Sequence, residues 1–215
     1  MTQGYGNFIL AQMQDTPVNE PVITDVVADA MAGAYGINKE RARKITNVNM
    51  KRLADRGRLI RISKGIYGTI RETPFGKIKS SQEEILSKML LREGGENIGY
   101  LAGPTLLNHL GLCSWIPRQC HIASNRYRQR IPEDVAICLQ KPLIPVNSNN
   151  APYLQTLEAI SAMERYPVDV NAPDEILRSI MRVAEIDAGR LVWMARNHVN
   201  QALLLKTIDY ALKQD

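Results

Sequence analysis

The 215-residue sequence predicts an α+β protein with two domains. Helical periodicity recurs along most of the chain, and two short segments rich in β-branched residues flank a glycine turn near residue 65. A proline and a glycine interrupt the pattern near residue 75, where we place the boundary between residues 1–75 and 76–215. With 45% hydrophobic and 23% charged residues, the composition excludes disordered, collagen-like and coiled-coil proteins.

Three helices are predicted in the first part of the chain, with capping residues at their ends. They cover residues 7–14, 24–35 and 39–56. Thr24 and Asn38 are the expected N-caps of the second and third helices, and Gly36 and Gly57 are expected to end them.

A hairpin is predicted directly after the third helix. Its strands cover residues 59–62 and 66–70, joined by a tight turn at residues 63–65. Three helices followed by a hairpin predict a winged helix-turn-helix, whose third helix enters the major groove of DNA.

The positive charge is concentrated around this third helix and hairpin. Within a net charge of +5, residues 1–38 contain four acids and no Lys or Arg, whereas residues 39–79 contain thirteen Lys or Arg and three acids. A solvated helix face is the alternative interpretation of such a run. The order of elements favours a surface that binds a polyanion.

On a helical wheel, the third helix separates a core side from a basic side. The core side carries Ala42, Ile45, Thr46, Asn49 and Leu53, and the opposite side carries Glu40, Lys44, Asn47 and Lys51. Lys44 and Lys51 lie about 10 Å apart along the axis, a span that fits a major groove roughly 12 Å wide.

Each side chain on this surface has a chemical role toward DNA. An asparagine can pair with adenine through two hydrogen bonds, so Asn47 is the best candidate for base recognition, and the cations suit phosphates or guanine. The predicted DNA-contacting residues are Arg41, Lys44, Asn47, Lys51, Arg52, Arg61 and Lys64.

The second domain is predicted to be mixed α/β and rich in helices. A Ser81 to Glu84 capping box opens its first helix. The predicted helices cover residues 82–91, 104–110, 153–165, 173–186 and 188–213, and the predicted strands cover residues 98–102, 120–124 and 135–139. The last helix is apolar around much of its circumference, which indicates burial or, alternatively, a partner chain.

No catalytic or metal-binding pattern emerges from the sequence. Three cysteines cannot form a complete disulfide framework, which favours a reducing cytoplasm, and their spacing from His109 and His121 does not suit zinc. Glu133 and Asp134 with Lys141 lack the second carboxylate position of a metal-dependent nuclease. We expect no catalytic residues, no cofactor and no metal, and therefore a protein that is not an enzyme.

Residues 51–67 and residues 99–125 form two sequence blocks that resemble the AbiEi-type antitoxins of bacterial abortive-infection toxin-antitoxin systems. One is residues 51–67 (KRLADRGRLIRISKGIY), similar to the end of that family's recognition helix and its wing. The other is residues 99–112 (GYLAGPTLLNHLGL), followed by Ile116-Pro117 and residues 121–125 (HIASN), similar to the start of its antitoxin domain. The resemblance covers residues 20–165 and leaves the C-terminal fifty residues unmatched.

The resemblance implies a transcriptional autorepressor whose second domain counteracts a nucleotidyltransferase-like toxin in phage defence. Its expected partners are the double-stranded DNA of its own promoter, the cognate toxin and, because operators are commonly palindromic, a second copy on DNA. Apolar runs of about four residues are far shorter than the ~20 needed to cross a bilayer, so no membrane partner is expected. The alternatives are a stand-alone winged-helix regulator that responds to a ligand and an enzyme tethered to DNA.

Overall fold

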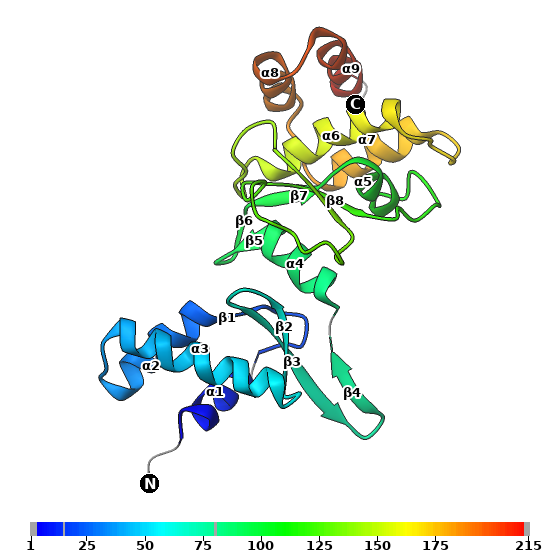
Figure 1. Ribbon diagram of the computed structural model, residues 1–215. Coiled ribbons are helices and arrows are strands. Elements are labelled where there is room, and N and C mark those ends of the chain that lie inside the picture. The colour runs from blue at the N-terminus through cyan, green and yellow to red at the C-terminus, as the bar shows by residue number, and fades with distance from the viewer. Residues whose placement is uncertain (1–3, 15, 80, 213–215) are drawn as a thin grey trace. The chain divides into compact units, whose positions relative to one another are not determined.

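The computed structural model describes residues 4–14, 16–79 and 81–212 (Figure 1). Helices and strands occur in both halves of the chain, which confirms the predicted mixture of α and β structure. The chain divides into two compact units, Met1–Met89 and Leu90–Asp215. Each unit is described by itself below.

The first unit combines three helices with a small antiparallel sheet (Figure 1). In chain order its elements are α1 (Tyr5–Gln14), β1 (Val22–Ile23), α2 (Thr24–Tyr35), α3 (Lys39–Asp55), β2 (Leu59–Ser63), β3 (Ile66–Thr73) and β4 (Gly76–Lys79). The strands follow the order β1-β3-β2, and β4 pairs with the far half of β3. The sheet therefore centres on β3.

The ends of α2 and α3 follow from local chemistry. Asn38 caps α3, since its side-chain oxygen accepts a hydrogen bond of 2.8 Å from the Arg41 backbone N–H. Gly36 and Gly57 end the two helices with φ of 62° and 67°, values that favour glycine. The prediction for Thr24 differs: Ile23 holds the N-cap position, and the Thr24 hydroxyl donates to the Gly65 carbonyl at 3.0 Å.

The core of the first unit lies between the helices and the sheet. Ile9 of α1, Met31 of α2 and Met50 of α3 are fully buried, and Leu59 and Tyr67 close the core from the strands. Burying a large apolar side chain contributes roughly 1.5–3 kcal/mol each. The three helices are thus held by one shared apolar cluster.

The proline and glycine break at residues 72–76, predicted as the domain boundary, forms the turn of the β3–β4 hairpin. Most of α4 (Gln82–Leu91) also belongs to the first unit, which ends at Met89, and the Gln82 side chain donates to the Ile62 carbonyl. The division between the units accordingly falls at Met89 and Leu90, beyond the predicted position near residue 75.

The second unit surrounds a three-stranded sheet with helices (Figure 1). After α4 its elements are β5 (Arg92–Glu93), β6 (Glu96–Asn97), β7 (Gly99–Leu101), α5 (Gly103–His109), β8 (Cys120–Ser124), β9 (Ile137–Gln140), α6 (Ala151–Arg165), α7 (Pro173–Val183), α8 (Ala188–His198) and α9 (Gln201–Leu212). β7 and β8 are antiparallel, whereas β8 and β9 are parallel. α6 contributes the largest share of the buried core.

The C-terminal helix differs from the prediction. The single helix predicted over residues 188–213 is two helices, with a break at Val199 and Asn200. The Asn200 side chain accepts a hydrogen bond of 2.9 Å from the Leu203 N–H, so it caps α9 as asparagine does at helix starts. Within residues 4–14, 16–79 and 81–212, no helix is both long enough and apolar enough to cross a bilayer.

Gly99 is predicted to be essential to the packing of the second unit. A Cβ at this position would lie 2.4 Å from the Leu90 carbonyl oxygen and 2.7 Å from that of Ala123, both backbone atoms. We expect Gly99→Ala to lower the free energy of unfolding by about 1–3 kcal/mol because the backbone must move. Urea unfolding measures this change.

Gly33 supplies the matched control. A Cβ there meets nothing within 4 Å, and the residue lies inside α2. Gly33→Ala should raise stability by about 0.5–1 kcal/mol, since alanine is the better helix former. Equal effects of the two substitutions would contradict the packing described for β7.

Candidate functional site

The structure places all seven predicted DNA-contacting side chains on the exposed surface of the first unit. They are Arg41, Lys44, Asn47, Lys51 and Arg52 on α3, Arg61 on β2 and Lys64 in the β2–β3 turn. We call the first five the α3 basic face. Lys44, Asn47 and Lys51 share one side of the helix, as their spacing predicts.

The α3 basic face points outward because the opposite side of the helix is buried. Ala42, Thr46, Met50 and Leu53 recur every three or four residues and are buried, where they pack among α1, α2 and the strands. Thr46 satisfies its hydroxyl by a contact of 3.6 Å to the Met31 sulfur. The wheel omitted Met50, which is fully buried, although its position between Thr46 and Leu53 marks it as core.

Ion pairs separate the cations of α3 into two groups. Lys39 pairs with Asp29 at 3.0 Å and Arg43 with Asp25 at 2.8 Å, so these two cations link α3 to α2. In the part of the chain that the structure describes, Arg41, Lys51 and Arg52 form no ion pair. Cations without a protein carboxylate are the ones available to a phosphate.

Lys44 differs from the other cations of the α3 basic face. Its ammonium lies 2.7 Å from Glu40 one turn earlier, with both side chains exposed. Exposed pairs of this kind are worth only about 0.3–0.5 kcal/mol, so a phosphate can displace the carboxylate. Glu40 therefore tempers the positive charge at the start of the helix.

The β2–β3 turn holds Lys64 in a fixed position beside the helices. Gly65 follows with φ of 79°, and its carbonyl accepts hydrogen bonds from both the backbone and the hydroxyl of Thr24 at the start of α2. Arg61 lies on β2 opposite Tyr67, with its side chain exposed. The turn thus adds two exposed cations to those of α3.

Further exposed cations lie outside the predicted set. They are Arg56 and Arg58 after α3, Arg71 on β3 and Lys77 and Lys79 on β4. Apart from Lys77, which lies 3.5 Å from Glu72, none forms an ion pair with a described residue. The density of Lys and Arg in residues 51–61 is the sequence signal for Arg56 and Arg58. The sequence does not predict the β3–β4 hairpin, which carries Arg71, Lys77 and Lys79.

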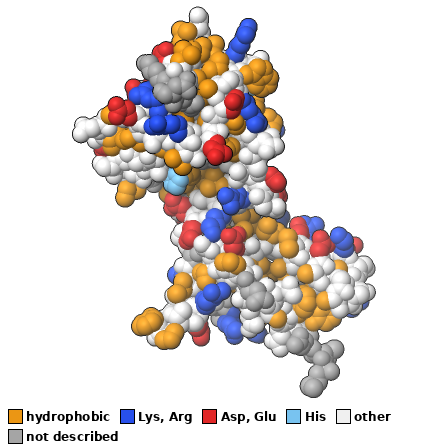
Figure 2. Space-filling view, turned by 180° about the vertical axis from the view of Figure 1, so that it is seen from behind, with side chains coloured by type: hydrophobic (Ala, Val, Ile, Leu, Met, Phe, Trp, Pro, Cys, Tyr) orange, Lys and Arg blue, Asp and Glu red, His pale blue; other side chains and the backbone are white. Residues whose placement is uncertain are grey.

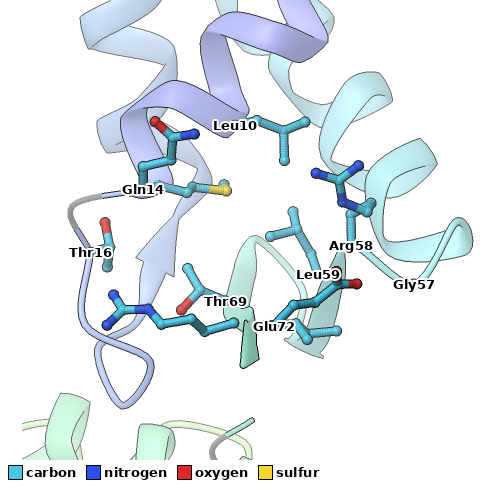
Figure 3. A pocket seen from close by; sticks show the side chains of 11 residues that line it. Leu10, Gln14, Thr16, Gly57, Arg58, Leu59, Thr69 and Glu72 are labelled. Atoms are coloured by element: carbon cyan, nitrogen blue, oxygen red, sulfur yellow. The ribbon is translucent and has the colours of Figure 1, made fainter. Parts of the chain in front are cut away.

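A pocket of about 390 Å³ opens between α1, the α3–β2 connection and β3 (Figure 3). Leu10, Gln14, Thr16, Arg58 and Thr69 are among the side chains around it. The Thr69 hydroxyl is buried and has no hydrogen-bond partner among the described residues. The pocket separates part of α1 from β3. All of the residues that line it belong to the first unit.

The three cysteines of the chain lie in the second unit. Cys113 is buried in the loop after α5, and Cys120 and Cys138 lie half-buried on β8 and β9. Burial, with a smaller effect of Asp169, raises the pKa of Cys113, so its unreactive thiol form is favoured. In residues 4–14, 16–79 and 81–212, no group of three potential metal ligands is assembled.

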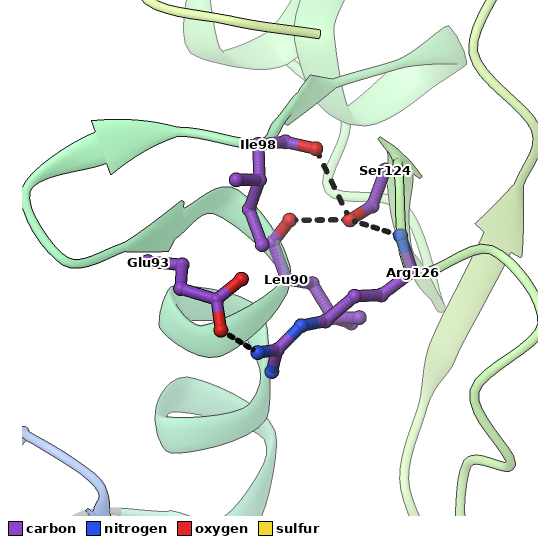
Figure 4. Close-up of polar contacts among 5 residues, drawn as sticks. All are labelled: Leu90, Glu93, Ile98, Ser124 and Arg126. Carbon is purple, nitrogen blue, oxygen red and sulfur yellow. Dashed lines mark hydrogen bonds and ion pairs between the residues drawn. The ribbon is translucent and has the colours of Figure 1, made fainter. Parts of the chain in front are cut away.

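Ser124 is a structural residue of the second unit (Figure 4). Its hydroxyl donates to the Leu90 carbonyl at 2.6 Å and accepts from the Arg126 N–H at 3.2 Å. Arg126 in turn pairs with Glu93. These bonds connect the end of β8 to the end of α4 and the strand that follows it.

Several large apolar side chains of the second unit are exposed on its last three helices. They are Val183 on α7, Trp193 on α8, and Leu205 and Leu212 on α9, with Trp193 62% exposed. Figure 2 shows hydrophobic side chains on this part of the surface. Of the two alternatives for the last predicted helix, burial does not hold for Trp193, Leu205 and Leu212, whose side chains are exposed.

Comparisons with known proteins do not assign a family. No protein-family model matches the chain, and no curated protein matches it.

We predict that Ser124→Ala destabilises the second unit. The substitution leaves the Leu90 carbonyl without its donor at a buried position, which costs about 1–3 kcal/mol. Urea unfolding followed by tryptophan fluorescence measures the loss. Ser179→Ala, at an exposed position of α7, is the control and should stay within about 0.5 kcal/mol of the wild type.

Proposed function

We propose that this chain is a DNA-binding transcriptional autorepressor and antitoxin of an abortive-infection toxin-antitoxin system. The observation that carries the proposal is the α3 basic face, with Asn47 between Lys44 and Lys51 on the exposed side of a helix whose other side is buried. A helix exposed in this way fits the major groove, since the groove is wide enough to admit it.

The topology of the first unit supports a winged helix-turn-helix. The order α1-β1-α2-α3-β2-β3, with the strands arranged β1-β3-β2, is the arrangement expected when a hairpin follows the recognition helix. In this proposal α3 is the recognition helix and the β2–β3 turn is the wing. Arg61 and Lys64 then meet the DNA backbone beside the groove.

The roles of the contacts follow from their donors. The Asn47 amide donates to and accepts from an adenine edge, which distinguishes bases. Arg41, Lys51, Arg52, Arg61 and Lys64 neutralise phosphates, which fixes position without reading sequence. Lys44 joins them once it leaves Glu40. Two copies on a palindromic operator would double these contacts.

The antitoxin part of the proposal concerns the second unit. Exposed apolar side chains on α7, α8 and α9, above all Trp193, suit a protein partner because aromatic residues are enriched in interfaces. With the resemblance of residues 99–125, they support a nucleotidyltransferase-like toxin as that partner. The proposal assigns no catalytic role to the chain.

A ligand-responsive regulator is the second candidate function. A pocket of about 420 Å³ lies within the second unit, and Tyr100, His109 and Leu177 are among the residues that line it. Pockets of this size and mixed polarity hold small molecules. Release from DNA by a small ligand, with no toxin encoded nearby, would favour this candidate over the antitoxin.

The DNA contact is tested by titrating duplex DNA at increasing salt. Five phosphate contacts predict that log K falls against log salt with a slope of about −4.5. Lys64→Ala should reduce that slope by about 1 for every sequence, whereas Asn47→Ala should lower discrimination between operator and random DNA by about 1–3 kcal/mol.

Lys141→Ala provides the matched control, because this exposed lysine belongs to the second unit. It should leave both the slope and the discrimination unchanged. A binding constant that does not respond to salt, or equal effects of all three substitutions, would refute the assignment of the DNA-binding face.

The antitoxin role is tested by co-expression with the nucleotidyltransferase-like gene expected beside this one. Wild-type chain should restore growth, and Trp193→Ala should weaken the rescue because it removes the largest exposed apolar contact. The variant should keep wild-type affinity for DNA. Growth that is independent of the wild-type chain would remove the antitoxin part of the proposal.

A further inference from the structure

The β3–β4 hairpin projects beyond the rest of its sheet (Figure 1). The first four residues of β3, Ile66 to Thr69, pair with β1 or β2, whereas Ile70 to Thr73 pair with β4 alone among the described strands. At about 3.3 Å per residue, the part of β3 that pairs with β4 alone is roughly 13 Å long. A two-stranded ribbon of this kind is an arm rather than part of the core.

The tip of the arm carries an unusual apolar side chain. Phe75 is 101% exposed, and Pro74 precedes it. The Thr73 hydroxyl donates to the Gly76 carbonyl at 2.8 Å and accepts from the Phe75 N–H at 3.3 Å, so the turn is held in one shape. The phenyl ring is thus presented to solvent on an ordered support.

Cations lie on both faces of the arm. The register pairs Glu72 with Lys77 and Ile70 with Lys79 on one face, and Arg71 with Ile78 on the other. Every residue of β4 is exposed. Glu72 is the single acid between residues 70 and 79, and it already pairs with Lys77 at 3.5 Å.

An apolar tip flanked by cations fits duplex DNA better than a protein surface. Phosphates attract the three cations of the arm. An apolar side chain that enters from the minor groove can insert between two base pairs and partly unstack them. The arm exceeds the minor-groove depth of roughly 7.5 Å, so the tip can reach the bases while the cations remain near the phosphates.

We propose that the β3–β4 hairpin is a second DNA-contacting element, which inserts Phe75 between two base pairs from the minor groove and bends the duplex. This inference rests on the proposed DNA-binding function. The β2–β3 turn and the Phe75 tip lie at opposite ends of β3, about 25 Å apart along an eight-residue strand. The arm therefore contacts a segment of DNA different from the one beside Lys64.

The test measures DNA bending by energy transfer between dyes on the two ends of a 40-base-pair duplex, roughly four turns of DNA, taken from directly upstream of this coding sequence. Wild-type chain should bring the ends closer, by a bend within the range of about 20–90° that wedges produce. Phe75→Ala should abolish most of the bend and keep salt-dependent binding, with affinity lowered several-fold. Phe75→Leu should retain part of the bend because leucine also wedges.

Ile78→Ala is the matched control, since Ile78 is an exposed apolar residue on the side of the same arm. It should leave the bend unchanged. A duplex that stays straight when wild-type chain binds, or an equal bend with Phe75→Ala, would overturn the wedge and leave the proposed function intact.

Two further outcomes would overturn the inference in other ways. Absence of any wild-type binding at low salt would reject the proposed function along with the wedge. A change in oligomeric state by Phe75→Ala in sedimentation, with the bend unaltered, would assign the tip to a protein contact instead.

Discussion

The burial of one side of α3 is the constraint on which the candidate site depends. Ala42, Thr46, Met50 and Leu53 fix the rotation of the helix about its axis because they pack against α1, α2 and the sheet. Once that rotation is set, the side chains of Lys44, Asn47 and Lys51 lie on the exposed side of the helix. Recognition in a groove requires a fixed rotation of the helix, because a helix free to rotate would present no defined set of donors.

Charge distribution reinforces the same orientation. The acids of α2 meet Lys39 and Arg43 on one flank of α3, which leaves Arg41, Lys51 and Arg52 without carboxylate partners among the described residues. The acidic first segment thus does not cancel the basic stretch as a whole. It neutralises the cations nearest α2 and leaves the outward cations to an external anion.

Local signals made part of the structure predictable. Asn38, Gly36 and the turn at Gly65 gave correct helix ends and a correct hairpin because each depends on a short-range hydrogen bond or a positive φ. The turn of the β3–β4 arm is predicted as a domain boundary, since Pro74 and Gly76 mark a hairpin turn and a domain boundary equally well. Pairing with β3, which decides between them, is not visible in the sequence.

Long-range contacts account for the remaining differences. The hydrogen bond from Ser124 to the Leu90 carbonyl joins residues 34 positions apart, and no periodic pattern in the sequence predicts it. The break between α8 and α9 did have a signal in Asn200, but the apolar residues around it favoured one continuous helix. The exposed Trp193 likewise depends on which neighbours cover it, a property of the assembled unit rather than of its helix.

Acetylation of lysines in the presence and absence of duplex DNA, read by mass spectrometry, tests the central claim most directly. If the outward side of α3 and the β2–β3 turn hold the duplex, DNA should slow the modification of Lys51 and Lys64 and leave Lys141 and Lys206 of the second unit unaffected. Bound DNA that leaves Lys51 and Lys64 as reactive as before would contradict the account.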